Sequence, residues 1–543
     1  MTCGVACTAL VVAACGSAGG GSGADDPTSE ADPEVPAAEA APGLLSTVDE
    51  SLAPGGTLDL QVHIDAVGAT GLDPQWADLA SSWQVMGLVY ETLVTVGPDF
   101  EVEPMLAESW EQPDDTTYVF HLRSGVEFSN GREMTADDVV GSLERLLELG
   151  SVWTGQLGPV ESVSATDDAT VEVVLAEPYT PFLAALANVP AAILPMREVA
   201  DGTVDLDTTM LGTGPFVVED HRPDVSWRFA RNEGYWHPDQ PALDGIDISI
   251  VPQEGSRIAA LRDGSASMIT LGNVDAPQVL GGVPQVEVLS QASTDYYYLM
   301  LNSQAPDSPF ADPRVRQAIN LAVDRQRIAD AALGGLVNPT GVTPVGLPGA
   351  CEPGDLPSAT GDLDAARALL SEAGADDLTF QLSIFSTEPA PAVAQVIEQS
   401  LREIGVSVEI EQLEEASWAG KVYGAAPAEF DAALSWFAGY ADPGMVTKWW
   451  NPDVAGFNLG FMAADDELSS LIDAVNTAPP GPDREQLMAD LCAAVEADAQ
   501  MLPLVTRPIA VGYRADAISP TVYATEGYGN PLRRLAETRS GQQ

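Results

Sequence analysis

Residues 104–147 constrain the fold most, because they carry three different local signals in a fixed order. Residues 117–122 alternate large apolar side chains with smaller or polar ones, which is typical of a half-buried strand. An Asn-Gly pair at 130–131 marks a tight turn, since glycine adopts a positive φ without strain. Thr135 and Asp138 have the spacing of a capping box at the start of a helix with one apolar face. The segment therefore predicts a strand, a turn and a capped helix.

The identities of the residues in this segment resemble one protein family. They are similar to the signature of the family 5 extracellular solute-binding proteins of ABC importers, which include oligopeptide- and dipeptide-binding receptors. A strand, turn and helix formed by chance would share the shape but not the residues. The matching positions, in order, are Ala107, Trp110, Tyr118, Phe120, Leu122, Arg123, Gly125, Val126, Phe128, Gly131, Thr135, Ala136, Asp138 and Val139.

Later segments of the chain continue the resemblance, which covers about residues 57–520. Helices and strands alternate along this part, and the alternation predicts an α/β fold. One helix is expected to begin with Asp312 as its N-cap and Pro313 as its first residue, and to end at the glycine pair 334–335. The other segments that resemble the family are 211–216, 231–236, 255–264, 296–302 and 310–320.

The resemblance implies a two-lobed architecture that the residues alone do not. From length and alternation, 543 residues suggest only a multi-domain α/β chain, at about 150 residues per domain. The family's fold is periplasmic-binding-protein-like (a Venus flytrap of type II, cluster C) with an extra inserted subdomain. The expected parts are lobe I at 57–95, 212–288 and 505–540, the inserted subdomain at 96–211, and lobe II at 289–504.

The charge balance excludes several partners. The chain has 23 basic and 81 acidic residues, for a net charge of −58. Nucleic acid is excluded as a partner, because phosphate contacts need clustered cations. Flat binding to anionic lipid headgroups is disfavoured for the same reason. Two explanations of the acidity stay open: adaptation to a salty habitat, or an acidic proteome without a salt requirement.

The front of the chain resembles a bacterial lipoprotein. Residues 1–15 form a short apolar segment that fits a secretory signal peptide, although no Lys or Arg precedes Arg123. Cys15 ends a lipobox-like run and is the expected lipidation site, which would anchor the protein outside the cytoplasm on the cell membrane. A chance cysteine in a small-residue segment is the alternative. Residues 16–56 are expected to be a disordered, acidic Gly/Ser/Pro linker.

Two cysteines remain after the signal segment and Cys15 are set aside. Cys351 and Cys492 are a possible disulfide, since an exported chain with two remaining cysteines favours one bond. Two buried free thiols far apart are the alternative. No paired-cysteine motif and no zinc-type spacing occurs.

Sequence motifs of catalysis are missing. There is no Walker A loop, no dinucleotide-binding glycine motif, no nucleophile elbow in the folded part and no HExxH, and the four histidines are scattered. The sequence therefore predicts no catalytic residue, no metal site and no cofactor. A secreted hydrolase stays as an alternative, because the carboxylates of a glycosidase need no local motif.

Candidate ligand-binding residues lie in an aromatic-rich part of the chain, because aromatic rings suit a cleft. Residues 436–443 resemble the family's cleft loop. In peptide-binding members the Asp three residues after the Trp pairs with the ligand's α-ammonium, and here that position is Gly439. The resemblance therefore puts a free peptide amine in doubt. The expected ligand-binding residues are Trp436, Tyr440, Gly439, Asp442, Tyr298 and Trp418.

These observations lead to one functional hypothesis. The protein is expected to be a monomeric substrate-binding lipoprotein of an ABC importer, which captures a small solute, peptide-like or other, in an interlobe cleft and delivers it to the permease subunits. Its contact with the membrane would be through the lipid anchor only. A secreted hydrolase, or a cell-surface sensor on the same fold, is the alternative. Turnover of esters or glycosides would favour the hydrolase, and neighbouring transporter genes would favour the importer.

The salty-habitat explanation predicts that added salt stabilises the protein. Ions screen the mutual repulsion of carboxylates, and the screening length falls from about 10 Å at 0.1 M salt to about 3 Å at 1 M. The melting temperature is then expected to rise steadily from 0.1 M to molar NaCl and to stay nearly unchanged in a neutral osmolyte. A flat salt curve would favour the acidic-proteome explanation.

Overall fold

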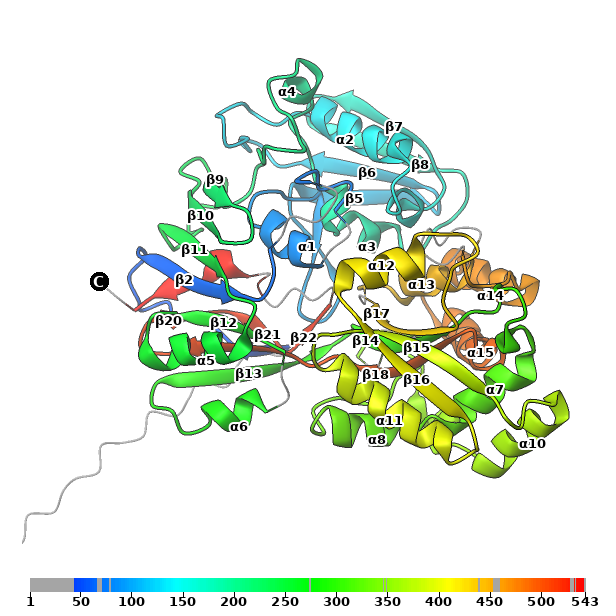
Figure 1. The fold of residues 1–543 in the computed structure, drawn as a ribbon. Coiled ribbons are helices and arrows are strands. Elements are labelled where there is room, and N and C mark those ends of the chain that lie inside the picture. The colour runs from blue at the N-terminus through cyan, green and yellow to red at the C-terminus, as the bar shows by residue number, and fades with distance from the viewer. Residues whose placement is uncertain are drawn as a thin grey trace, which may run out of the picture. The chain divides into compact units, whose positions relative to one another are not determined.

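The structure is a computed structural model and describes residues 43–541, with gaps at 66–70, 78–79, 273–274, 345, 348, 438–439, 453–459, 528–531 and 533. The signal segment, Cys15 and most of the expected linker lie outside the described residues. Three main sheets, each accompanied by helices, organise the described chain (Figure 1).

The first sheet has eight strands in the order β22-β13-β19-β12-β2-β11-β10-β9. Its centre is parallel, because β2 pairs in parallel with both β11 and β12, whereas β9, β10, β13 and β19 join by antiparallel pairing. Helix α5 (Glu254–Asp263) packs against β12 and β19. The strands are β2 (Thr57–Val62), β9 (Phe216–Arg222), β10 (Ser226–Arg231), β11 (Gly245–Ile250), β12 (Met268–Leu271), β13 (Val286–Ser293), β19 (Ile509–Arg514) and β22 (Thr525–Glu526).

The second sheet has five strands in the order β16-β15-β17-β14-β18. Every residue of β14 and β18 is buried, and the helices α7, α10, α11, α14 and α15 belong to this part of the chain. The strands are β14 (Tyr296–Leu301), β15 (Thr379–Phe385), β16 (Ser407–Leu413), β17 (Ala432–Phe437) and β18 (Met501–Thr506). The helices are α7 (Pro313–Ala322), α10 (Leu363–Ala373), α11 (Ala390–Arg402), α14 (Asp466–Thr477) and α15 (Pro482–Asp498).

The third sheet is the inserted one and has four antiparallel strands in the order β5-β6-β8-β7. Helix α2 (Ala136–Leu149) packs against β7 and β8. The predicted capping box is confirmed, with the backbone N–H of Thr135 donating to the Asp138 carboxylate at 3.0 Å, and Gly150 ends the helix in the left-handed conformation. The strands are β5 (Ala107–Asp114), β6 (Thr117–Leu122), β7 (Val160–Asp167) and β8 (Thr170–Leu175).

Two short segments connect the first sheet to the second. Strand β13 ends at Ser293 and β14 begins at Tyr296, so the first crossover is 294–295. Strand β18 ends at Thr506 and β19 begins at Ile509, so the second is 507–508. The expected lobe boundaries at 288/289 and 504/505 lie inside β13 and β18, a few residues before these crossovers. Apolar alternation continues across a crossover and gives no sign of which sheet a strand joins.

Two other expectations need correction. The linker was expected to reach residue 56, but β1 (Leu44–Ser46) pairs with β21 (Val522–Tyr523), because its leucines pack against the protein. The helix that begins at Pro313 ends at Ala322 instead of near residue 334. Val323 adopts an extended conformation there, and Asp324 caps a new short helix by accepting from the backbone N–H of Arg327 at 2.9 Å.

Two glycines in the segment before β9 resemble the family, and the close backbone contacts of this segment explain why glycine is needed there. The backbone N–H of Gly214 donates to the carbonyl of Val89 at 2.8 Å. A Cβ added at Gly212 would lie 2.1 Å from the same oxygen, so a side chain cannot be accommodated. Between them, Thr213 donates to the buried carboxylate of Glu91 at 2.8 Å. Burial raises the pKa of Glu91 to about 7, although Tyr235, Trp236 and Thr213 all donate hydrogen bonds to it.

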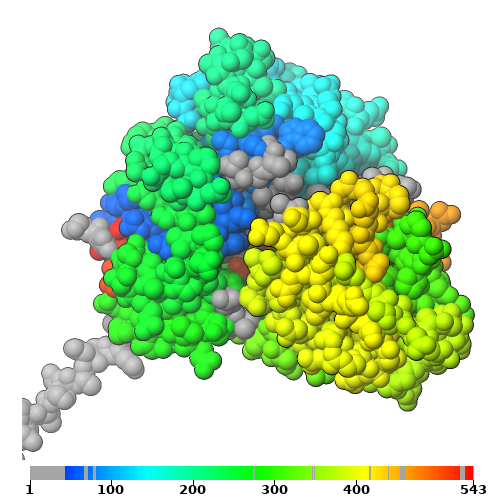
Figure 2. All heavy atoms as spheres, viewed as in Figure 1, coloured from blue at the N-terminus to red at the C-terminus, as the bar shows by residue number. Residues whose placement is uncertain are grey.

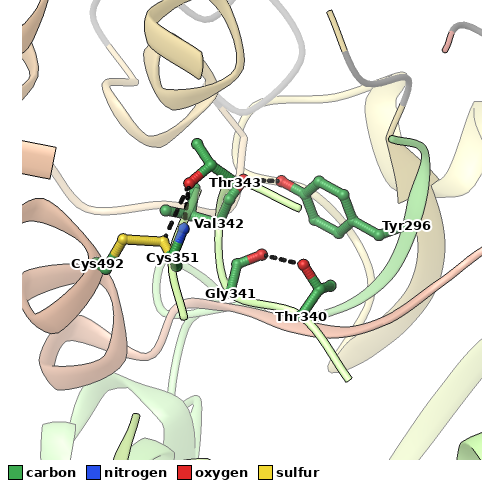
Figure 3. Close-up of a disulfide and its surroundings, with 7 residues drawn as sticks. All are labelled: Tyr296, Thr340, Gly341, Val342, Thr343, Cys351 and Cys492. Carbon is green, nitrogen blue, oxygen red and sulfur yellow. Dashed lines mark hydrogen bonds between the residues drawn. A yellow bond between two sulfur atoms is a disulfide. The ribbon is translucent and has the colours of Figure 1, made fainter. Parts of the chain in front are cut away.

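Cys351 and Cys492 form a disulfide in the structure, with Cα atoms 5.9 Å apart (Figure 3). The bond joins helix α15 to the loop at 340–351. The loop is held further by the backbone N–H of Cys351, which donates to the Thr343 hydroxyl at 2.9 Å. Tyr296, on strand β14, donates from its hydroxyl to the carbonyl of Val342 at 2.9 Å. The disulfide therefore fixes a long loop to helix α15, beside the second sheet.

We expect the loss of this disulfide to lower the free energy of unfolding by about 2–5 kcal/mol, because the bond closes a loop of 141 residues in the unfolded chain. Urea unfolding with and without a reductant measures the loss. The Cys351→Ser/Cys492→Ser double variant is the control, since it should unfold at the same urea concentration in both conditions. Equal unfolding of the oxidised and reduced wild type would contradict this role.

Candidate functional site

The two crossovers between the sheets are tied to each other. The backbone N–H of Arg507 donates to the carbonyl of Asp295 at 2.8 Å, and their side chains form an ion pair at 3.4 Å. The Asp295 side chain is fully buried, whereas that of Arg507 is 23% exposed. A buried carboxylate needs such a partner, because desolvation of an unpaired charge is costly. Backbone and side chains together therefore hold the two connections side by side.

Trp436 lies at the same place. It is partly exposed near the end of β17 and opposite Tyr297 of β14. The guanidinium carbon of Arg507 lies 3.6 Å from the centre of the Trp436 ring, within the range of a cation–π contact. One face of this predicted ligand-binding ring is thus covered by a crossover residue.

Tyr298, on β14, and Trp418, on helix α12 (Glu415–Tyr423), are both core residues. Tyr298 is fully buried, stacks on Phe437 with ring centres 4.2 Å apart, and shares a 3.0 Å hydrogen bond with the Tyr423 hydroxyl. Trp418 is buried as well and donates from Nε1 to the Ser383 carbonyl at 3.2 Å. In this structure both rings contribute to the core beneath the aromatic-rich region.

Asp442 has its carboxylate fully engaged. It is the N-cap of α13 (Pro443–Thr447) and accepts from the backbone N–H of Gly444 at 2.7 Å. Arg484 donates to both carboxylate oxygens, at 2.7 and 3.1 Å. This bidentate geometry fixes the start of the helix. Gly439, the position at which the family's Asp is expected, lies outside the described residues.

Tyr440 is buried and borders a hollow between the inserted sheet's helices and the loop that follows β17. The hollow's empty space, open mouth included, is about 240 Å³, and its interior has room for about one water molecule. Burial raises the pKa of Tyr440 well above its ordinary value, with Asp295 adding to the effect. The other lining residues are Leu146, Trp153, Gln156, Leu157, Ala185, Asn188, Pro190, Ala191 and Met445.

The insert also contacts the second sheet's helices directly, and we call these contacts the clasp. Lys448 donates from Nζ to the carbonyl of Gly155 at 2.7 Å and lies 4.2 Å from the centre of the Tyr179 ring. Thr180 donates from its backbone N–H to Asn476 at 2.8 Å and from its hydroxyl to Ala478 at 2.6 Å. Insert and second-sheet atoms approach one another on the face seen in Figure 2. The clasp and the crossovers are thus two separate connections between parts of the chain.

Lys448 is one of only two lysines in the chain. Burial lowers its pKa from the ordinary 10.5 to about 8, and Asp473 opposes the shift. Burial in the clasp therefore disfavours the charged form of the Lys448 side chain.

Several of these residues were not predicted. Nothing in the local sequence marks Asp295 or Arg507, because each follows a strand end and the two are far apart along the chain. Trp153 and Gln156 lie in a short 3₁₀ segment (Thr154–Leu157 and its N-cap) that has no periodic pattern. The sequence signal at Arg507 is a lone cation after a mostly apolar strand.

The described residues contain no cluster of three His, Cys, Asp or Glu side chains that could hold a metal ion. His221 stacks on Trp227 and contacts Asp65 at 3.1 Å, in a structural arrangement. Among the helices of the described ranges, none combines the length and the apolar character that a membrane span requires.

Comparison with known proteins identifies the family. A model described as bacterial extracellular solute-binding proteins, family 5 Middle, matches residues 101–458. The glutathione-binding protein GsiB of Salmonella typhimurium is 28% identical over 492 residues, 87% of this chain and 93% of that protein. Heme-binding protein A of Haemophilus influenzae is 32% identical over 396 residues, 66% of this chain and 70% of that protein.

A solved structure agrees with both comparisons. DppA of Helicobacter pylori, a periplasmic binding protein in complex with the peptide STSA, superimposes with a TM-score of 0.79 at 25% identity, covering 90% of this chain and 99% of that one. This likeness confirms the predicted α/β, two-lobed periplasmic-binding-protein fold. Proteins of the matched family are extracytoplasmic transport components that bind peptide-like solutes and work with ABC permeases. The resemblance first visible in residues 104–147 is confirmed: the chain belongs to the family 5 bacterial extracellular solute-binding proteins and is the solute-binding component of an ABC importer.

Proposed function

We propose that this protein grips a small peptide-like solute between two lobes and passes it to its permease without changing any bond in it. The observation that carries the proposal is the pair of crossovers, because only two short segments, tied by Arg507 and Asp295, connect the two large sheets. Such a connection permits a hinge motion with few new backbone conformations. Trp436 and Tyr440 lie beside it, where a solute would contact both lobes.

The lobes of the proposed mechanism follow the sheets. The first sheet forms lobe I, the inserted four-stranded sheet and its helices move with it, and the second sheet forms lobe II. A solute that contacts both lobes favours the closed form, which is a shift between two populations. The clasp contacts form only when the insert and lobe II meet, so we assign them to the closed form.

We infer the solute class from the relatives and from one position at which this chain departs from the family pattern. GsiB is named for glutathione and DppA is bound to a peptide, so a peptide-like solute fits both. Gly439 replaces the family's amine-binding Asp, and Asp442 is occupied by Arg484. We therefore infer that a solute amine is not held by an ion pair in this loop. Of the six expected ligand-binding residues, we retain Trp436 and Tyr440 as contacts and assign Tyr298, Trp418 and Asp442 to their support.

The attachment to the membrane remains as expected from the sequence. We propose that Cys15 carries the lipid, that the acidic segment after it is a tether, and that the protein acts as a monomer. A net charge of −58 leaves no basic surface for anionic headgroups, so the acyl chains would supply the membrane affinity.

We expect Trp436→Ala to abolish the rise in melting temperature that a binding peptide or sugar produces, because the ring is lost from the cleft and Arg507 loses its stacking partner. A thermal-shift screen against a peptide and sugar library measures this, since a bound solute stabilises by mass action. Trp110→Ala is the control, because this ring is partly buried against the core and is far from Trp436 in the sequence. It should lower the melting temperature of the free protein and leave affinity unchanged. Equal affinity in wild type and Trp436→Ala would refute the placement.

The clasp predicts that affinity depends on pH. Closing the lobes buries Lys448, and burial lowers its pKa from 10.5 to about 8. Closure therefore releases a proton between pH 8 and 10.5, and the closed form gains relative to the open form as pH rises through this window. We expect the affinity for a binding peptide to rise from pH 8 to 10 in wild type and to change less in Lys448→Met. Titration calorimetry at several pH values measures both. The same pH profile in the two proteins would contradict the assignment of the clasp to the closed form.

A further inference from the structure

We propose that the hollow beside Gln156 and Tyr440 is a subsite for an uncharged group of the solute, made of a peptide-type N–H and the small aliphatic carbon next to it. The inference rests on the proposed function and names the part of the solute that the insert recognises.

Gln156 provides the polar half of the subsite. Its side chain lines the hollow and is 7% exposed, yet its Oε1 atom has no hydrogen-bond partner among the described residues. Its backbone is fully engaged, since its N–H donates to Trp153 at 2.9 Å and its carbonyl accepts from the Tyr179 hydroxyl at 3.2 Å. A buried acceptor without a donor is unfavourable, and a donor on an incoming group would remove that cost. The backbone of Gln156 is thus fixed, while its side-chain oxygen has no hydrogen-bond donor among the described residues.

The walls of the hollow determine the charge of the group that can enter. The described residues that line it are aliphatic or aromatic apart from Gln156, Asn188 and the hydroxyl of Tyr440, and none is Asp, Glu, Lys or Arg. This is informative in a chain with 81 acidic residues. A carboxylate or an ammonium group would be buried there without a counter-charge, which is far more costly than burying an amide. The nearby carboxylate of Asp442 is already paired with Arg484.

The size of the hollow limits the group further. With room for about one water molecule as it stands, it accepts a methyl or methylene carbon and an N–H rather than a large side chain. The position also matters, because Gln156 and Trp153 belong to the insert whereas Tyr440 and Met445 follow β17 of the second sheet. A group in the hollow touches both sides and therefore favours the closed form.

N-methylacetamide tests the subsite without knowledge of the solute, because its N–H and N-methyl carbon can enter the hollow while its acetyl group stays at the open mouth. Saturation-transfer NMR on the intact protein at millimolar concentration measures its binding, with acetate and methylammonium as its charged counterparts. We expect transfer to N-methylacetamide only, and at least tenfold weaker binding in Gln156→Met, which keeps the length of the side chain and removes the acceptor. Gln317→Met, at a partly exposed position on α7, is the matched control and should behave as wild type.

Three results would overturn the proposal: no transfer to N-methylacetamide in wild type, equal transfer to acetate or methylammonium, or unchanged binding in Gln156→Met. The melting temperature of free Gln156→Met adds an independent check. It should equal or exceed that of wild type, because the variant removes an unpartnered acceptor, whereas a purely structural glutamine would lower it. If Gln156→Met does not fold, Ala185→Leu replaces it, because the larger side chain fills the hollow and should block the probe.

A panel of Gly-Xaa-Gly tripeptides separates this inference from the proposed function. If no tripeptide stabilises wild type while the N-methylacetamide contrast holds, the peptide-like solute is wrong and the subsite stands. If tripeptides bind wild type and Gln156→Met equally, the peptide-like solute stands and the subsite is wrong.

Discussion

The ion pair and backbone hydrogen bond between Asp295 and Arg507 are the constraint on which the rest of the arrangement depends. The two large sheets are joined by only two crossovers, and each has two residues. They lie side by side because the strands on each side of them pair, β13 with β19 and β14 with β18. The contacts between Arg507 and Asp295 link them between these two strand pairs, and Trp436 rests against the Arg507 guanidinium. In the proposed mechanism, the partly exposed ring that we assign to the solute is therefore also in contact with a connecting segment.

Arginines are few in this acidic chain, and several work inside the protein rather than on its surface. Arg257 donates to the carbonyls of Thr270 and Val251, and Arg325 donates to the carbonyl of Pro503 and to Asn320. Arg484 fixes Asp442. A planar guanidinium with five donors suits such carbonyl-rich sites better than an ammonium does. The excess of carboxylates therefore remains mostly at the surface, where water and ions screen it.

The sequence predicted local structure well where one segment contains the whole signal. The capping box at Thr135 and the strand at 117–122 both appear as expected, because each depends on neighbours in sequence. The family and the two-lobed fold were recognisable because many residues match in order. The two crossovers carry no such local signal, since the choice between two sheets depends on pairing partners far along the chain.

The candidate site was harder to predict, for a physical reason. Tyr298 lies in a strand that is buried on both faces, so alternation carries no information about which side chain faces a cleft. Asp442 looked like a ligand carboxylate until its partner Arg484, 42 residues away, was in view. The unpartnered oxygen of Gln156 has no counterpart in sequence at all, because it is defined by the absence of donors in three dimensions.

The pairing of β1 with β21 has a mechanical consequence. Leu44 lies opposite Tyr523, and Arg539 donates to the carbonyls of Glu50 and Leu52, so the chain entering at residue 44 and the chain near residue 540 are fastened together. Neither belongs to the five-stranded sheet. In the proposed closing motion, a pull on the chain before Leu44 would act on this fastening in lobe I and not on the five-stranded sheet of lobe II. A fluorescent or affinity label appended near Ser540 would then report on lobe I.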